Sequence, residues 1–585
     1  MNKHRRDGRP SESNSAQGSS ERRRLLKSAA AVLAGGAAIA YDCAYAGMST
    51  SSAAPAKARA GRPDLIVALD GRAVVDTGCG PVAGYIREGI YTFKGIPYAD
   101  TTEGDHRFVP PVKAKAWTDV RSSRQYGHVA PQPPRTGWAN DEEAFMFTWD
   151  DGIPGEDCLR VNIWTPGIND GKKRPVMVWL HGGGFTAGSG QELRSYDGEN
   201  LARRGDVVVV SLNHRLNALG FLDLSKFGER YQPSANVGML DIVAALEWVR
   251  DNIAGFGGDA SRVTLFGQSG GGGKVGALMG MPSAKGLFHR AIVESGSMLR
   301  FGTPERAQTI SDLVVAELGL NHPTIDQIHT LPYARIVEAG AKVLRDRNKR
   351  PAGAVPDFRH LVDQLGFSPV VDGNILPEQP FDPKASALSA EVPMIIGTTL
   401  NEFVTALNHP EYEAMTSEEL TQRVKGMFGE NAEGIIQAFR KRTPSAKPFD
   451  LWSHIAASPV RQSAIRQASA KAALGAAPAY LYWFSWKTPI LNGRPRAFHC
   501  AEIPFVFDNT DRCETMTGGG SEARILGAKI SDAWIAFASS GNPNHSGIPH
   551  WPEFSVQSVP TMIFDSTVSL VNDPDGEEQR SIAPT

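Results

Sequence analysis

The stretch GQSGGGGK, residues 267–274, combines a serine and a terminal lysine with a run of glycines, directly after the apolar run VTLF. A phosphate-binding loop would need the pattern G-x-x-x-x-G-K-[ST], in which the final hydroxyl binds magnesium. Here Gln268 stands where the first glycine is required, and Val275 stands where the hydroxyl is required. The sequence therefore excludes a phosphate loop at both ends of the motif.

The same residues match G-x-S-x-G, a sharp turn between a strand and a helix that presents a nucleophilic serine. Ser269 is the serine of this motif, and a helix is expected from about Gly271. The strand and the helix pass so close together that only glycine fits between them. The N-terminus of the helix points at the site and favours negative charge there. The pattern predicts a serine nucleophile.

A serine nucleophile also needs donors for the oxyanion of the tetrahedral intermediate. These donors are usually backbone N–H groups, and losing one costs about 10²–10³ in rate. The motif HGGGF, residues 181–185, follows the apolar run VMVWL and is the glycine loop expected for this task. Two glycine clusters, each placed just after a strand, favour acyl-transfer chemistry over a merely flexible loop.

Both motifs lie within a part of the chain where apolar, strand-like runs alternate with helical patterns. Strands separated by helices of this length form parallel βαβ units, so an α/β sheet covered on both faces is expected. Residues 300–470 are rich in helix formers and are expected as helical insertions around the sheet. The predicted strands cover 174–180, 206–212, 262–267 and 290–296, the helix covers 236–253, and later strands and loops cover 370–377, 392–399 and 477–486.

The remaining triad members follow the serine in the order acid, then histidine. Nine of the 14 histidines lie beyond Ser269, and the residue order alone does not choose among them.

With these motifs, the chain resembles the type-B carboxylesterase family, which includes bacterial p-nitrobenzyl esterases, cholinesterases and the non-catalytic neuroligins. The resemblance runs from about residue 64 to the C-terminus and is densest between 155 and 300. The matching stretches are GEDCLRVNIWTPG, VMVWLHGGGF, YDGENLARRGDVVVVSLNHRLNALGFL, NVGMLDIVAALEWVRDNIAGFGGD, VTLFGQSGGG, HRAIVESGS and HCAEIPFVF. This resemblance implies an α/β-hydrolase fold, with a mostly parallel central sheet flanked by helices and helical insertions over the active site.

The resemblance also implies the triad. The family's nucleophile falls on Ser269, its acid on Glu402 and its histidine on His499, while Asp372 is a rival acid that fits a turn better. His499 would take the serine proton and return it to the leaving alcohol, and Glu402 would hold the imidazole. Since the base must be neutral, activity is expected to fall below about pH 7. The implied oxyanion donors are the N–H groups of Gly183, Gly184 and Gly270.

Two residues depart from the family pattern, and one family cysteine lacks its usual partner. Gln268 replaces the usual glutamate before the nucleophile, which weakens the case for a cationic choline ester. Gly270 replaces the usual alanine; it keeps the N–H but could loosen the turn. Cys158 matches a family half-cystine, but no cysteine lies between 80 and 157 to pair with it, so that disulfide is not expected. Trp149 is equally suited to lining the pocket and to packing.

The first 62 residues differ from the rest of the chain. Residues 22–27, RRRLLK, precede a short apolar run rich in alanine and glycine, and 44–46 form an A-x-A cleavage site. The apolar run of about 14 residues is shorter than a membrane span of roughly 20. We expect a twin-arginine-type signal peptide at 1–46, read by the twin-arginine export machinery, and a flexible leader at 47–62. The hydrolase domain is then expected at 63–585, periplasmic or secreted, without a stable membrane anchor.

Composition narrows the possible partners. A net charge of −2, with 61 basic and 63 acidic residues, argues against nucleic-acid binding. The five cysteines form no C-x-x-C motif, and no H-E-x-x-H motif is present, so neither a metal nor a cofactor is expected. The sequence carries no signal for an oligomeric state.

The leading hypothesis is an exported serine carboxylesterase that acts on uncharged or weakly charged small to medium esters. An amidase, a carbamate hydrolase or a hydrolase of one specific ester would use the same machinery. A non-catalytic binding protein of the neuroligin kind is disfavoured, because the predicted nucleophile, histidine, acid and glycine loop are all present. A lipase would need a lid and aggregated substrate.

Overall fold

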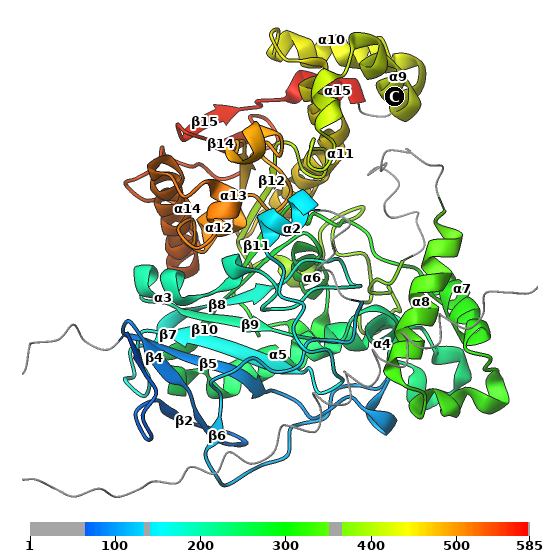
Figure 1. The fold of residues 1–585 in the computed structure, drawn as a ribbon, viewed down its shortest axis with the longest axis vertical. Helices are drawn as coiled ribbons and strands as arrows, with labels where there is room; N and C mark the ends of the chain where they lie inside the picture. The colour runs from blue at the N-terminus through cyan, green and yellow to red at the C-terminus, as the bar shows by residue number, and fades with distance from the viewer. Residues whose placement is uncertain (1–64, 134–140, 350–365, 583–585) are drawn as a thin grey trace, which may run out of the picture. The chain divides into compact units, whose positions relative to one another are not determined.

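A computed structural model describes residues 65–133, 141–349 and 366–582. Contacts divide the chain into two units, Met1–Pro63 and Asp64–Thr585. The predicted signal peptide and leader lie outside the described residues. The second unit is built on one large sheet, drawn in Figure 1.

The large sheet has twelve strands in the order β1-β4-β5-β7-β9-β8-β10-β11-β12-β13-β14-β15. Its middle, from β9 to β14, is parallel throughout, and the strands on either side pair antiparallel. A small second sheet has the order β2-β3-β6. The strands are β1 (Ile66–Val67), β2 (Val74–Thr77), β3 (Gly80–Ala83), β4 (Tyr85–Arg87), β5 (Ile90–Pro97), β6 (Arg121–Ser122), β7 (Arg160–Thr165), β8 (Arg174–Leu180), β9 (Val208–Leu212), β10 (Gly258–Gln268), β11 (Arg290–Glu294), β12 (Met394–Thr399), β13 (Ala479–Phe484), β14 (Pro560–Phe564) and β15 (Ser569–Asn572).

Helices cover both faces of this sheet. Successive side chains of a strand point to opposite faces, and along β8 Val178 joins one buried cluster while its neighbour Trp179 joins another. The first cluster includes residues of α5 and α6, and the second includes residues of α3 and α14. The helices are α2 (Asp141–Phe147), α3 (Glu199–Gly205), α4 (Asn217–Phe221), α5 (Val237–Asn252), α6 (Gly270–Leu278), α7 (Pro304–Glu317), α8 (Tyr333–Arg347), α9 (Ser417–Phe428), α10 (Ala432–Arg442), α11 (Pro448–Ala472), α12 (Ile503–Val506), α13 (Glu514–Thr517), α14 (Ser521–Ser540) and α15 (Gly576–Ile582).

The predicted α/β architecture is confirmed, and the predicted strands appear as β8, β9, β10 and β11. The expected strand 206–212 begins two residues later, and α6 begins at Gly270 instead of Gly271. Of the segment 370–377, only Val370 pairs, in an isolated bridge to Gly302. The rest of that segment is turn, because the Asp372 side chain accepts backbone N–H groups and closes it locally.

The helical insertions predicted over 300–470 are α7 to α11, with β12 of the main sheet between α8 and α9. Helices α9, α10 and α11 share a separate buried cluster that includes Leu420, Ile435 and Trp452. They lie together at the top of Figure 1, whereas α7 and α8 lie at its right. The insertions therefore form two separate groups.

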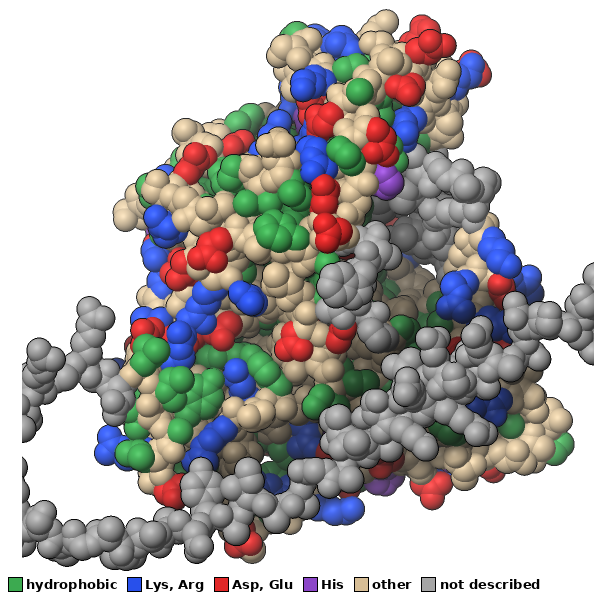
Figure 2. Space-filling view, in the orientation of Figure 1, with side chains coloured by type: hydrophobic (Ala, Val, Ile, Leu, Met, Phe, Trp, Pro, Cys, Tyr) green, Lys and Arg blue, Asp and Glu red, His purple; other side chains and the backbone are tan. Residues whose placement is uncertain are grey.

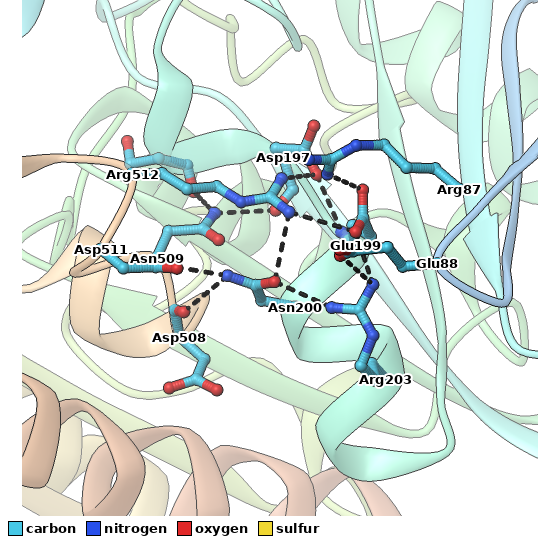
Figure 3. A network of polar contacts seen from close by, with 11 residues as sticks. Arg87, Glu88, Asp197, Glu199, Asn200, Arg203, Asp508, Asn509, Asp511 and Arg512 are labelled. Atoms are coloured by element: carbon cyan, nitrogen blue, oxygen red, sulfur yellow. Dashed lines mark hydrogen bonds and ion pairs between the residues drawn. The ribbon is translucent and has the colours of Figure 1, made fainter. Parts of the chain in front are cut away.

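A polar network fixes the segment that follows α12 (Figure 3). Arg512 contacts Asp197 at 2.8 Å and Glu199 at 3.2 Å, and Asn509 donates to the Asp197 carbonyl at 2.8 Å. Arg87 of β4 also pairs with Glu199, which is buried at the start of α3. The network thus holds β4, α3 and the segment after α12 together.

Charge is mixed on the face drawn in Figure 2, where acidic and basic side chains are interspersed. Across the described residues, no helix is both long and apolar enough to cross a membrane. Four cysteines are free thiols: Cys79, Cys158 and Cys513 are buried, and Cys500 is half-buried.

Candidate active site

Ser269 lies at the turn between β10 and α6, with φ 57° and ψ −124°. A non-glycine residue with positive φ is uncommon, and such strain is typical of functional turns. The turn is held because the Ser269 N–H donates to the Glu294 carbonyl of β11 at 2.8 Å. The serine side chain is half-buried, while Gln268 and Gly270 on either side are buried.

The glycines around Ser269 are required by close backbone contacts. A Cβ at Gly271 would lie 1.9 Å from the Leu180 carbonyl oxygen of β8, and one at Gly267 would lie 2.7 Å from the same oxygen. A Cβ at Gly270 would lie 2.4 Å from Gly184 Cα. The strand, the helix and the HGGGF loop therefore meet where only hydrogen atoms fit, as the motif predicts.

The HGGGF loop turns directly after β8, with positive φ at Gly183 (80°) and Gly184 (63°). The buried Lys274 of α6 donates from Nζ to the His181 carbonyl at 2.8 Å and so ties the start of the loop to the helix. Burial lowers the pKa of Lys274 to about 7. Lys274, which had suggested a phosphate loop, thus has a structural role: it holds the loop that carries two of the predicted oxyanion donors.

Glu402 lies just after β12 and His499 lies in the loop after β13, and their side chains meet. His499 Nδ1 lies 2.6 Å from Glu402 Oε2, and the His499 N–H donates to the Glu402 carbonyl at 2.8 Å. Glu402 Oε1 accepts the Thr399 N–H at 3.0 Å, and Glu402 has a φ of 40°. Both side chains are nearly inaccessible, with 12% of His499 and 1% of Glu402 exposed. The pair is oriented by backbone as well as by side-chain contacts.

Gln268 contributes a contact that the motif did not predict. Its amide nitrogen lies 3.3 Å from His499 Nδ1 and 3.2 Å from His499 Nε2, while its Oε1 accepts the Cys500 thiol at 3.2 Å. Within the described ranges, no hydrogen bond joins the Ser269 hydroxyl to His499. Catalytic hydrogen bonds are often long without substrate and tighten in the complex. The arrangement therefore remains compatible with proton transfer between these two residues.

The rival acid lies in a different environment. Asp372 accepts the N–H groups of Asn374 and Leu376 at 2.9 and 3.1 Å, and its second oxygen accepts the Asn236 amide at 3.0 Å. These contacts identify it as a turn residue.

Trp149, for which pocket lining and packing were both open, stacks on Phe147 at 4.8 Å. Phe147 in turn packs edge-on against Phe498, the residue before His499, at 5.7 Å. Trp149 also borders a small hollow with Gln132 and Glu192 but does not line the cavity beside the HGGGF loop, so the contacts of the described residues show packing.

Two further buried carboxyl groups lie beneath the site, and sequence reasoning missed both. Glu294 ends β11 and accepts the Trp534 indole N–H at 2.8 Å, and Glu502 accepts the Ser295 hydroxyl at 3.5 Å. Each has an Oε2 without a hydrogen-bond partner among the described residues. Burial raises the pKa of Glu294 to about 8; burial, Glu294 and Glu402 together raise that of Glu502 well above its ordinary value. Their only sequence signal was membership in the stretches HRAIVESGS and HCAEIPFVF.

A cavity of about 220 Å³, lined mainly by apolar side chains but also by Arg300 and Arg306, opens beside the HGGGF loop. A cavity of about 150 Å³ is enough to hold benzene, so this one has room for a ring or a short alkyl chain. Part of its wall comes from α7 and from the residues just before Asp372. Its lining includes Gly184, Phe185, Phe221, Met298, Phe301 and Phe367.

In the part of the chain that the structure describes, no group of three or more histidine, cysteine, aspartate or glutamate side chains could hold a metal ion. The chemistry that this arrangement of a strained serine, glycine N–H groups and a carboxylate–imidazole pair can support is acyl transfer.

Comparison with known proteins decides the family. The model of the carboxylesterase family matches residues 71–580. The chain belongs to the carboxylesterase family. The para-nitrobenzyl esterase of Bacillus subtilis is 37% identical over 518 residues, covering 88% of this chain and 99% of that protein. The phenmedipham hydrolase of Pseudarthrobacter oxydans is 34% identical over 524 residues, covering 88% and 97%.

Solved structures agree with this family. The carboxylesterase EST55 of Geobacillus stearothermophilus has a TM-score of 0.73 at 34% identity, covering 88% of this carboxylesterase and all of that chain. An esterase from Clostridium hathewayi, described as able to hydrolyze aliphatic aromatic polyesters, has a TM-score of 0.74 at 33% identity, covering 88% and 98%. The fold is therefore that of the α/β hydrolases, and the chain is a carboxylic ester hydrolase.

Proposed function

We propose that this carboxylesterase is an exported serine enzyme that cleaves uncharged or weakly charged small to medium esters through an acyl-Ser269 intermediate. The observation that carries the proposal is the meeting of three elements at one edge of the sheet. These are the strained Ser269 turn, Gly184 packed on Gly270, and the 2.6 Å contact of His499 with Glu402.

The proposed reaction has two halves. Ser269 Oγ attacks the ester carbonyl carbon while its proton passes to His499 Nε2, and the N–H groups of Gly183, Gly184 and Gly270 stabilise the oxyanion. The C–O bond then breaks, and His499 gives the proton to the leaving alcohol. Water attacks the acyl-serine by the same route and releases the acid. Glu402 holds Nδ1 protonated and stabilises the imidazolium in both halves.

The cavity beside Gly184 supports the proposed substrate size. It adjoins the predicted oxyanion donors, and several of its walls are phenylalanine rings. A pocket of this kind favours a short alkyl or aromatic group on one side of the ester. The proposal of export rests on the basic run at 22–27 and the cleavage pattern at 44–46.

The test is hydrolysis of p-nitrophenyl acetate and p-nitrophenyl butyrate by the mature chain and by Ser269→Ala. We expect turnover by the wild type and a loss of at least about 10³-fold in kcat for the variant. p-Nitroacetanilide, assayed alongside, separates an esterase from an amidase. Equal turnover by both proteins would show that Ser269 is not the nucleophile, and a folded but inactive wild type would favour a single-substrate hydrolase or a binding protein.

A further inference from the structure

The surroundings of the His499 ring are unusual in two respects. A glutamine amide approaches both ring nitrogens, and an exposed phenylalanine covers the ring. The Phe403 and His499 ring centroids are 3.7 Å apart with an interplanar angle of 33°. Phe403 is nevertheless 48% exposed. An aromatic side chain so open to solvent, directly after the candidate acid Glu402, calls for a physical reason.

The distances place Gln268 over a face of the imidazole. Its amide nitrogen is equally far from Nδ1 and Nε2, at 3.3 and 3.2 Å. An atom at such equal distances either lies over the ring or points in the ring plane at Cε1, between the nitrogens. The in-plane position would bring it well inside van der Waals contact with Cε1. The amide therefore lies over the ring face.

Phe403 must occupy the opposite face. A centroid separation of 3.7 Å is reached only by a group stacked on a ring, and two groups this close cannot share one face. The Cys500 thiol donates to Gln268 Oε1 at 3.2 Å, which leaves the amide N–H groups directed at the imidazole. An N–H over an aromatic face is a weak attractive contact, and ring stacking on the other side adds to it.

We infer that Gln268 and Phe403 form an imidazole clamp that fixes the plane of His499 between the Glu402 carboxylate and the nucleophile. The clamp residues are positioning residues, because they act on the reaction through His499. The inference rests on the proposed role of His499. Glu402 holds only the Nδ1 atom, so the plane of the His499 ring could still tilt about this contact. Gln268 on one face of the ring and Phe403 on the other prevent this tilt.

The first test is kinetic and uses Gln268→Met and Phe403→Leu, singly and together. A catalytic group misplaced by about 1 Å can cost 10²-fold, so we expect each single variant to lower kcat about tenfold or more with KM within about twofold. Because either change frees the ring, the double variant is expected to lose little more than the worse single variant. Phe403→Tyr keeps a stacking ring and is expected to retain wild-type kcat.

Two matched controls share the chemistry of the change. Phe145→Leu alters a phenylalanine that is 50% exposed, and Gln467→Met alters a glutamine that is fully buried. Both are expected to keep wild-type kcat and melting temperature. Full additivity in the double variant, or single variants indistinguishable from these controls, would overturn the clamp.

The second test does not depend on activity. Carbethoxylation of His499 by diethyl pyrocarbonate, followed by peptide mass spectrometry, is expected to be several times faster in Phe403→Leu than in the wild type and in Phe145→Leu. Equal rates in all three would overturn the clamp. The two proposals can fail separately. If Ser269→Ala kept full turnover while His499 still reacted faster in Phe403→Leu than in the wild type, the proposed nucleophile would be wrong and the clamp would stand.

Discussion

Three glutamates lie within one small region of this carboxylesterase, and they differ in their hydrogen-bond donors. Glu402, Glu294 and Glu502 are all almost fully buried, with exposures of 1%, 0% and 1%. Glu402 accepts hydrogen bonds at both oxygens, from the Thr399 N–H and from His499. Glu294 and Glu502 each have one acceptor contact and one oxygen without a partner in the described residues.

Hydrogen-bond donors, more than depth of burial, therefore decide whether a buried carboxyl group favours its charged or its neutral form. Two strong donors suit a carboxylate and allow Glu402 to face an imidazolium. With fewer donors, burial favours the neutral acid, and the pKa values of Glu294 and Glu502 rise.

Replacing Glu402 is expected to lower activity more strongly than any of the changes that follow. Glu402→Gln keeps the shape of the side chain but presents the wrong partner to His499 Nδ1, so kcat is expected to fall about 10³–10⁴-fold. The measurement is kcat on p-nitrophenyl butyrate. The matched control is Asp372→Asn, which makes the same chemical change in a turn. It is expected to keep kcat within about threefold, and a large loss there with a small loss at Glu402 would exchange their roles.

A smaller effect, on stability, is expected from the other two carboxyls. Below the ordinary glutamate pKa of 4.5, Glu294 is protonated in both the folded and the unfolded chain. Between 4.5 and about 8, the folded chain keeps a proton that the unfolded chain releases. The stability contributed by this proton is therefore full at low pH and is lost as pH rises through about 8.

The double variant Glu294→Gln/Glu502→Gln removes this proton linkage. Its melting temperature, relative to that of the wild type, is expected to rise by on the order of a few degrees between pH 5 and pH 8. Thermal unfolding monitored by circular dichroism measures the difference. Glu338→Gln, at an exposed position on α8, serves as the control and is expected to show no such trend. A constant difference across this pH range would mean that the two carboxyls are ionised in the folded protein.

The smallest effect is expected at Tyr482, whose buried hydroxyl has no hydrogen-bond partner among the described residues. Burial, with the nearby glutamates, raises its pKa well above the ordinary value. Tyr482→Phe removes a hydroxyl that gains nothing in the fold, so the free energy of unfolding is expected to stay within about 0.5 kcal/mol or to increase slightly. Urea unfolding provides the measurement. A loss above about 1 kcal/mol would indicate that the hydroxyl bonds one of the carboxyls.

How much of the structure could be predicted from the sequence depends on how far apart the interacting residues lie along the chain. The Ser269 turn and the HGGGF loop were predictable because each motif is a run of consecutive residues, although the glycines of the turn contact the backbone of Leu180 and Gly184 in a distant part of the chain. Glu402 and His499 lie 97 residues apart, and only the family resemblance selected them. An α/β sheet was predictable as a class, but its antiparallel edge strands were not.

The clamp and the unpaired carboxyls were beyond sequence reasoning for the same reason. Gln268 appeared only as a departure from a motif, and nothing local indicates that Phe403 reaches the same imidazole. Glu294 meets Trp534 across 240 residues. The cavity likewise combines the HGGGF loop with α7 and the chain before Asp372. Such groupings depend on how distant strands and helices pack.

Lys274 provides a chemical probe of the intact nucleophile turn. Its amine is fully buried against the His181 carbonyl, so amine-reactive reagents can reach it only when α6 separates from the sheet. Exposed lysines, by contrast, react in the native state. The fraction of Lys274 that such a reagent labels therefore measures the fraction of molecules in which the nucleophile turn has opened. A single peptide, followed by mass spectrometry, can report on the integrity of the site inside a cell extract.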